Sequence, residues 1–207
     1  MEQITAPRIL CIYGSPRKDG NSDRLMDAFV EGLEEGGAVA QKIYLRELRF
    51  NPCREIYACR NSGECALKDD ITAIYAELRS ADAIAFAMPV MFYGAGALAK
   101  SFIDRAQALW GIKYLLNQQV ATGRLKKRKG VLLSVAGSRG QKVFDGLRLI
   151  FRYFLDALDA DPWGEVVCRE VDVKGDIDKH PETLAEAREL GKRLAGELGA
   201  EIAGLSA

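Results

Sequence analysis

The sequence predicts a single α/β domain over residues 1–207, built on a doubly wound parallel sheet of five strands. Two observations carry this prediction. Five short segments have the pattern of strands, and the first of them is almost continuously apolar, as in a strand that helices cover on both faces. Between them lie segments whose apolar residues repeat every three or four positions, the spacing of one helix face. Strands that alternate with helices pair in parallel through right-handed crossovers, and the strand order 2-1-3-4-5 is preferred.

The first strand and the first helix show both patterns. Arg8–Tyr13 is an apolar run that ends at a glycine, and the helical pattern of Asn21–Gly36 follows it and stops at a second glycine. The same reasoning predicts strands at Val39–Leu45, Ala83–Ala87, Val131–Ala136 and Glu165–Val171. It predicts helices at Asp70–Arg79, Ala95–Leu109, Val143–Leu158 and Glu182–Leu198. Residues 110–130 fit neither pattern and are predicted to be irregular.

The composition is that of a packed globular protein with balanced charge. Hydrophobic residues make up 48% of the sequence, and 29 Lys and Arg balance 29 Asp and Glu. This balance favours neither nucleic acid nor an anionic membrane as a partner. No apolar run reaches the roughly 18 residues that span a bilayer, and residues 1–7 lack a secretory pattern, so the protein is expected in the cytoplasm. The basic run Lys126–Lys129 is interpreted as the solvated entry to a strand.

The loop between the first strand and the first helix is rich in hydrogen-bond donors. It reads Gly14-Ser-Pro-Arg-Lys-Asp-Gly-Asn-Ser22 and leads into a helix, whose first backbone N–H groups have no partner within the helix. A phosphate at this place gains from the helix dipole and from donors such as Ser15, Arg17 and Ser22. Taken alone, Asn21 fits an N-cap and Ser15 a turn residue equally well. The loop has neither the G-x-G-x-x-G pattern of dinucleotide sites nor the G-K-S/T ending of a Walker loop.

Two further loops are expected at the same edge of the sheet, because parallel strands that follow each other end there. Met88–Gly94, after the third strand, offers flat and polarisable side chains on which a planar ring can lie, although such residues more often belong to a hydrophobic core. Gly137-Ser138-Arg139-Gly140, after the fourth strand, has enough glycine for its backbone to approach a ligand closely. The three loops together predict one crevice.

Three motifs in this order resemble a known group of proteins. They are G-S-P-R-K-x-G-N-S after the first strand, P-V-x-F-Y-G after the third, and Ala99–Arg105 on the next helix. From about Arg8 to Arg105, and more loosely through Ser138, the sequence resembles the NADPH-dependent FMN reductases and iron-sulfur flavoproteins of the flavodoxin-like fold. The resemblance implies that FMN is the cofactor and that its phosphate, ribityl chain and ring contact Ser15, Arg17, Asn21, Ser22, Pro89, Val90, Met91, Phe92, Tyr93, Gly94, Gly137 and Ser138.

The cysteines limit how far the resemblance extends. Iron-sulfur flavoproteins supply four ligands from a compact loop that begins C-x2-C-x2-C, whereas this sequence has Cys53, Cys59 and Cys65 there, with Ile56 at the position of the second cysteine. A 4Fe-4S cluster normally takes four cysteine ligands, and the other two cysteines fall in predicted buried strands. We therefore expect no cluster, and no zinc site either, because the only histidine, His180, is distant in sequence. The three thiols remain as packing residues or as a redox-sensing dithiol.

The activity implied by the resemblance is that of an oxidoreductase. Hydride passes from NAD(P)H, as a transient co-substrate, to the flavin and then on to a small acceptor such as a quinone or free flavin. Because FMN carries the chemistry, no catalytic acid, base or nucleophile is predicted. Three alternatives remain: an electron carrier that works with a protein partner, an iron-sulfur flavoprotein if a cluster is present, and a structural or regulatory α/β module with an empty crevice. Flavodoxins are usually strongly acidic, so the balanced charge favours the reductase over the carrier.

The resemblance also implies a homodimer or a homotetramer. Residues 110–124 and the cysteine loop are the candidate contact surfaces. Lys100, Asp104 and Arg105 are interpreted as helix ion pairs or as part of the dimer surface, since residues four apart on a helix lie side by side.

Overall fold

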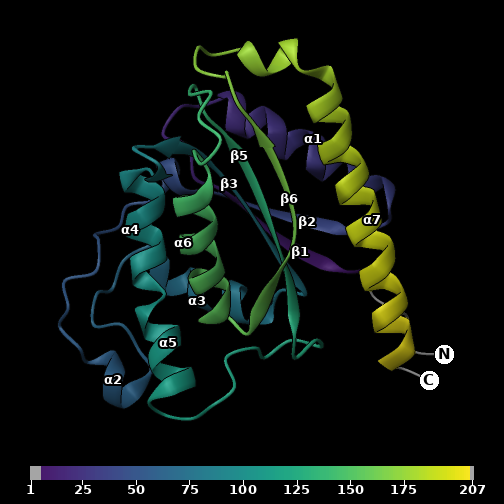
Figure 1. The fold of residues 1–207 in the computed structure, drawn as a ribbon. Helices are drawn as coiled ribbons and strands as arrows, with labels where there is room; N and C mark the ends of the chain where they lie inside the picture. Colours follow the sequence, from purple (N-terminus) through teal and green to yellow (C-terminus); the bar gives the residue numbers. More distant parts are fainter. Residues whose placement is uncertain (1–5, 206–207) are drawn as a thin grey trace.

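The computed structural model describes residues 6–205, and a parallel sheet forms its centre (Figure 1). The strands are β1 (Arg8–Tyr13), β2 (Val39–Tyr44), β3 (Ala83–Met91), β5 (Arg128–Val135) and β6 (Ala160–Cys168). They lie in the order β2-β1-β3-β5-β6, and each adjacent pair is parallel. A two-residue strand, β4 (Gly94–Ala95), pairs antiparallel with the end of β3. The predicted doubly wound sheet and its strand order are confirmed.

Helices cover both faces of this sheet (Figure 1). One face carries α1 (Asn21–Glu35) and α7 (Pro181–Leu205). The other carries α3 (Ile71–Ser80), α4 (Ala97–Arg105), α5 (Gln107–Tyr114) and α6 (Asp145–Asp156). Three short helices occupy loops: η1 (Leu45–Glu47), α2 (Cys59–Ser62) and η2 (Asp176–Lys179). Between residues 6 and 205, none of the helices has the length and apolar character needed to cross a membrane.

The alternation of side chains along each strand divides the core into two layers. In β1, Ile9, Cys11 and Tyr13 pack with the residues of α1 and α7, while Leu10 and Ile12 pack with α3, α4 and α6. All five of these side chains are fully buried. Their apolar character on both faces is the reason why a continuous apolar run predicted this strand correctly.

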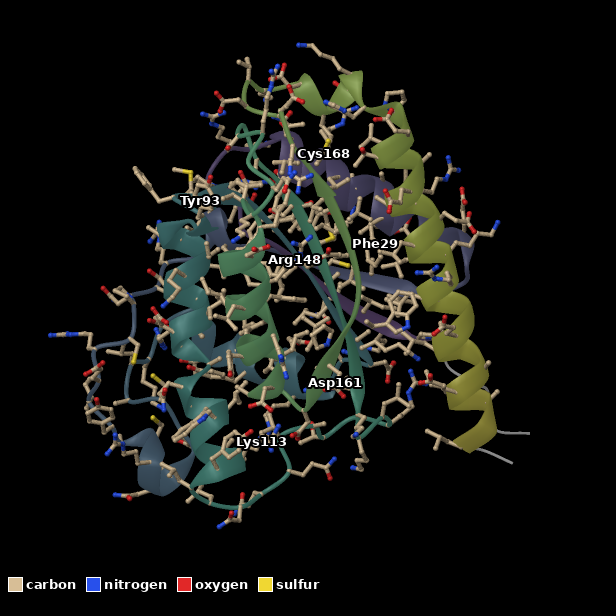
Figure 2. The ribbon with its side chains drawn as sticks, in the orientation of Figure 1. Phe29, Tyr93, Lys113, Arg148, Asp161 and Cys168 are labelled. Atoms are coloured by element: carbon tan, nitrogen blue, oxygen red, sulfur yellow. The ribbon has the colours of Figure 1, made fainter. Side chains whose placement is uncertain are left out.

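Two glycines let α1 and α7 pack closely on their face of the sheet. A Cβ atom added at Gly32 would lie 1.8 Å from the backbone oxygen of Arg188, and one added at Gly191 would lie 2.1 Å from the backbone oxygen of Phe29. These distances leave no room for a side chain. Phe29 lies between the two helices and the sheet, fully buried (Figure 2). The close contact fixes α1, whose first turn faces the loop after β1.

Several predicted boundaries differ from the structure. The predicted helix Ala95–Leu109 is two helices that meet at Ala106, and the second continues to Tyr114, inside the stretch predicted to be irregular. Strand β3 extends to Met91 because it pairs with both β5 and β4, so most of the predicted loop after it is strand. Strand β6 begins at Ala160 and not at Glu165; it lies at the edge of the sheet, where Pro162 costs no ladder hydrogen bond on the open side.

The interpretation of Lys126–Lys129 as a solvated entry is wrong for Arg128. This side chain is 1% exposed, and its guanidinium donates hydrogen bonds to the carbonyl oxygens of Leu78 (2.6 Å), Ala81 (3.3 Å) and Leu158. Burial lowers the pKa of Arg128 to about 10. Arg128 therefore joins the ends of α3 and α6 beneath the start of β5. The run of basic residues in the sequence does not indicate that this side chain is buried.

Arg105 is also buried, which corrects its interpretation as a surface residue. Its guanidinium forms two hydrogen bonds with the Asp69 carboxylate, at 2.7 and 3.1 Å, and donates to the carbonyl oxygen of Asn51 at 2.8 Å. It thereby anchors the long cysteine-containing loop between β2 and α3 to α4. The predicted helix ion pair is present one turn earlier, where Lys100 Nζ lies 2.6 Å from Asp104 Oδ1.

Candidate functional site

A cavity of about 420 Å³ opens at the carboxyl ends of β1, β3 and β5. This is the edge at which the three predicted loops were expected to meet, so the predicted crevice is present. Figure 2 shows the carboxyl edge at the upper end of the view, where Tyr93 and Cys168 are labelled. The cavity is lined by Gly14, Ser15, Pro16, Arg17, Gly20, Asn21, Ser22, Pro89, Val90, Met91, Gly96, Ala97, Leu98, Val135, Gly137, Val171 and Asp172.

The floor of the cavity is the junction between β1 and α1. Gly14 donates its backbone N–H to the carbonyl oxygen of Ala87 at 2.7 Å, and a Cβ atom there would meet the Phe86 ring at 2.7 Å. The first hydrogen bond of α1 runs from the Arg24 N–H to the Gly20 oxygen at 3.0 Å. Within residues 6–205, the backbone N–H groups of the three preceding residues, 21–23, donate to no other residue. Such free amides at a helix N-terminus form a site for an anion.

The two predicted serines of this loop are both buried and both line the cavity, but their hydroxyls differ. Ser15 Oγ accepts a hydrogen bond from the Arg17 N–H at 3.1 Å, so the expected role of Ser15 as a turn residue is real. Ser22 is 2% exposed, and in the described part of the chain its hydroxyl has no hydrogen-bond partner. The Ser22 hydroxyl is therefore the more available donor.

Asn21 and Arg17 connect the first loop to the segment after β6. The Asn21 side chain donates to the Val173 oxygen at 2.8 Å and accepts from the Gly175 N–H at 2.9 Å. It therefore makes no N-cap hydrogen bond, and its amide is committed to holding this segment. Arg17 is exposed at the rim, with Nη1 3.2 Å from the Asp172 oxygen. The sequence indicated neither connection, because the partners are more than 150 residues away.

The loop after β3 is a tight hairpin, and it places its residues in two groups. Pro89, Val90 and Met91 line the cavity. Phe92 and Tyr93 form the turn with left-handed backbones, at φ values of 48° and 61°, and Phe92 is fully exposed. The structure thus leaves Phe92, Tyr93 and Gly94 outside the cavity lining, at or beyond its rim.

The loop after β5 contributes Gly137 to the cavity wall. Gly137 lines the cavity, and a Cβ atom on it would lie 3.0 Å from the Asp172 side chain. Ser138 does not line the cavity; its hydroxyl accepts a hydrogen bond from the Gly140 N–H at 3.1 Å. The Tyr93 hydroxyl lies close to Gly140, 2.8 Å from where a Cβ atom would be, so the β3–β4 hairpin and this loop contact each other.

Sequence reasoning missed two parts of the cavity wall. One is the start of α4, where Gly96 precedes the helix and Ala97 and Leu98 face the cavity. The glycine before a helical pattern was a usable signal for a second helix N-terminus at this edge. The other part is Val171 with Asp172, after β6. No local signal marks them, since only the order of the strands brings the end of β6 beside β5.

In the described part of the chain the thiols are not arranged as metal ligands. Cys53, Cys59 and Cys65 are partly buried in the loop around α2, and none of them lines the cavity. Burial raises the pKa of the Cys59 thiol. Cys11 and Cys168 are buried in β1 and β6. Within residues 6–205, no group of three or more His, Cys, Asp or Glu side chains is arranged to hold a metal ion. The residues present therefore do not fit a four-cysteine cluster.

Several known proteins are similar to this chain in sequence or in fold. An iron-sulfur flavoprotein of Methanosarcina thermophila is 33% identical over 132 residues, 64% of this chain and 64% of that protein, so the match spans just under two thirds of its length. An iron-sulfur flavoprotein of Methanocaldococcus jannaschii is 29% identical over 91% of this chain and 95% of its own. The solved NAD(P)H:quinone oxidoreductase from Methanothermobacter marburgensis has the same fold, with a TM-score of 0.70, 22% identity and coverage of 92% of this chain and 96% of that one.

The family assignment comes from a match to the whole first part of the fold. The family model described as NADPH-dependent FMN reductase matches residues 7–164, from the start of β1 into β6. This range includes the loops after β1, β3 and β5 that form most of the cavity wall. The chain therefore belongs to the NADPH-dependent FMN reductase family.

Proposed function

We propose that this protein is an FMN-dependent oxidoreductase that takes hydride from NAD(P)H and passes electrons to a small acceptor such as a quinone or a free flavin. One observation carries the proposal: a cavity whose polar end is a helix N-terminus with free amides, and whose remaining wall is apolar, in a chain of the FMN reductase family. A flavin mononucleotide has the matching shape, a phosphate at one end and a flat ring at the other.

The residues of the cavity fit FMN in their donor chemistry. The free amides of residues 21–23, the Ser22 hydroxyl and the Arg17 guanidinium suit a phosphate dianion. We assign the phosphate to Ser15, Arg17, Asn21 and Ser22, where Asn21 acts through its backbone. We assign the ribityl chain and ring to the segment from Pro89 to Gly94 with Gly137 and Ser138, and add the start of α4 and Asp172 to this set.

When bound, FMN supplies the hydride acceptance and the electron transfer. The protein's part is to bind and orient the cofactor. The apolar side chains of Val90, Met91 and Leu98 keep water from part of the cavity. We assign the entry of a nicotinamide or an acceptor to the exposed hairpin tip at Phe92 and Tyr93. No side chain of the cavity wall has the nucleophile-and-base arrangement of a hydrolase, in keeping with a reaction that the cofactor carries.

Spectroscopy tests the cofactor and the activity in turn. The protein as purified, or after incubation with FMN and removal of the excess, should show the two absorbance bands of a bound flavin. Anaerobic stopped-flow mixing with NADPH or NADH should then bleach these bands within a catalytic time. Bleaching only in the presence of a partner protein would establish the electron carrier instead. A protein that stays colourless with FMN would contradict the proposal.

We also propose that the thiols hold no iron-sulfur cluster. The reason is the ligand count, since three half-buried cysteines and Ile56 occupy the loop in which the relatives' cluster would be expected. Iron and acid-labile sulfide analysis of anaerobically purified protein should give values near zero. A broad brown absorbance shoulder, with about four irons per chain, would overturn this view.

The active form we propose is a homodimer in the cytoplasm. An apolar groove of about 370 Å³ between α4, α5 and α6 exposes Trp110, Leu149 and Tyr153, and Trp110 begins the stretch predicted to contact a second copy. All five cysteines are free, as is usual in a reducing compartment. Light scattering should give the mass of a dimer for the parent protein and of a monomer for Tyr153→Glu. A monomeric parent would refute the assembly.

A further inference from the structure

A buried ion pair lies beneath the loop between β1 and α1, outside the cavity lining. Arg46, in η1 after β2, places Nη1 2.9 Å from Asp23 Oδ2, and the two side chains are 12% and 4% exposed. Arg46 Nη1 also lies 3.5 Å from the backbone oxygen of Ser15. Asp23 Oδ2 accepts a further hydrogen bond from the Asp19 N–H at 3.1 Å. The pair thus holds both ends of the loop, including Asp19, whose backbone is left-handed at φ 52°.

The position of Asp23 raises an electrostatic problem. It is in the first turn of α1, next to the free amides that form the proposed phosphate site. A carboxylate there is favoured by the same helix dipole as a phosphate, and it repels a phosphate that binds beside it. Desolvation raises the pKa of Asp23 although Arg46 and Asp19 act in the opposite direction. Asp23 Oδ1 is buried without a hydrogen-bond partner, so Arg46 and the Asp19 N–H, both at Oδ2, are the groups that compensate this carboxylate.

Arg46 is held where it can cancel this charge. Its guanidinium stacks on Tyr44 at 4.7 Å from the ring centroid, and Tyr44 in turn packs on Tyr13, with ring centroids 4.3 Å apart. The Tyr13 hydroxyl donates to Asp27 at 2.7 Å on the next turn of α1. Arg46 Nε is buried without a partner.

We propose that Arg46 is a positioning residue that makes the loop selective for a phosphorylated flavin: it neutralises Asp23, while Asp23 orders the loop through the Asp19 N–H. The inference rests on the proposed function, since it assumes that the loop binds the FMN phosphate. It requires that Arg46 raises the affinity for a flavin only when that flavin carries a phosphate. Riboflavin, which lacks the phosphate, should be nearly insensitive to the charge at this position, whereas FMN should be sensitive to it.

The test is the affinity of the cofactor-free protein for FMN and for riboflavin, measured by quenching of flavin fluorescence. Arg46→Met leaves Asp23 uncompensated and should weaken FMN binding about tenfold or more, while riboflavin binding changes about twofold or less. Arg46→Lys keeps the charge and should stay near the parent for both ligands. Asp23→Asn/Arg46→Met removes both charges and should recover most of the lost FMN affinity.

A matched control is Arg24→Met, which removes an exposed arginine one residue further along α1, where Arg24 pairs with Asp178 at 2.9 Å. It should change neither affinity. Equal losses for FMN and riboflavin in Arg46→Met, or no recovery in the double variant, would show a merely structural role and overturn the inference. A parent that binds neither flavin would refute the proposed function itself. Circular dichroism shows whether each variant is folded. If Arg46→Met is not, Asp23→Asn tests the charge instead: it removes the carboxylate, keeps Arg46, and should not weaken FMN binding relative to riboflavin binding.

Discussion

The two edges of the sheet differ in whether their polar groups have hydrogen-bond partners within the protein. At the amino edge, Asp82 accepts hydrogen bonds from the Arg8 N–H at 2.8 Å and from Arg124, and Arg128 donates to three carbonyl oxygens. At the carboxyl edge, the amides of residues 21–23 and the Ser22 hydroxyl have no partner within residues 6–205. Figure 2 shows the two edges with Asp161 at the lower one and Tyr93 at the upper one.

The difference separates groups that stabilise the fold from groups that bind a ligand. A buried polar group without a partner costs about 1–3 kcal/mol, so several free donors gathered beside a cavity favour a ligand there. The amino edge is closed by its own side chains. The carboxyl edge is left to water or to a ligand, for which we propose FMN. Four predictions test this division, from the largest expected effect to the smallest.

Removing Arg128 should destabilise the fold without affecting the site. Arg128→Ala leaves the Leu78, Ala81 and Leu158 carbonyls without their donor and opens a cavity, so we expect the free energy of unfolding to fall by about 3–5 kcal/mol. Denaturant titration measures this. The exposed neighbour Lys127, changed to Ala, is the control and should change stability by about 0.5 kcal/mol or less. A loss of FMN affinity in folded Arg128→Ala would contradict the view that the amino edge only stabilises the fold.

Removing the donors of the first loop should weaken FMN binding and leave the stability of the fold almost unchanged. The double variant Arg17→Ala/Ser22→Ala should weaken FMN binding about 100-fold, about 2.7 kcal/mol, because two phosphate donors are lost. Its stability without FMN should change much less. Lys18→Ala, an exposed change in the same loop, serves as the control. Fluorescence titration gives the affinities, and a double variant that holds FMN as firmly as the parent would refute the assignment of the phosphate.

The Asp69–Arg105 pair should stabilise the cysteine loop in a pH-dependent way. Burial alone would raise the pKa of Asp69, but hydrogen bonds from Arg105 and from backbone amides outweigh it and lower the pKa below its usual 3.8. A lowered pKa means that the stabilisation is complete above pH 3.8 and is lost as the pH falls through the folded-state value. Asp69→Asn should therefore be less stable than the parent by about 2 kcal/mol at pH 7.

Thermal unfolding at several pH values measures this difference, which should shrink as the pH falls below about 4. Asp70→Asn, at the neighbouring exposed position, is the control. A difference that stays constant down to pH 2 would show that the carboxylate charge of Asp69 contributes nothing.

The exposed Lys100–Asp104 pair on α4 should contribute least. Both side chains are more than 40% exposed, and ion pairs of this spacing on a helix surface stabilise by about 0.3–0.5 kcal/mol. Lys100→Ala should lower the unfolding free energy by no more than that, and less in high salt, with FMN affinity unchanged. An effect as large as that of Arg128→Ala would contradict the distinction between buried and surface charges.

Much of the fold and part of the site could be predicted from the sequence. The central strands such as β1 were found because they are apolar on both faces, and the first loop was found because its donors lie between a strand and the first turn of a helix. The break at Ala106 and the β3–β4 hairpin were missed, since the apolar pattern runs on through both. The binding roles of the predicted residues remain predictions.

The sequence by itself determined the elements, the order of the strands and the three loops at one edge, because these depend on local periodicity and on the rules of parallel crossovers. Only the tertiary structure decided which charges are buried. Arg46, Arg105 and Arg128 resemble surface residues in the sequence, yet each meets its partner from a distant segment. The physical reason is that a long charged side chain can be buried wherever carbonyls or a carboxylate satisfy it, and those acceptors come together only when the chain is folded.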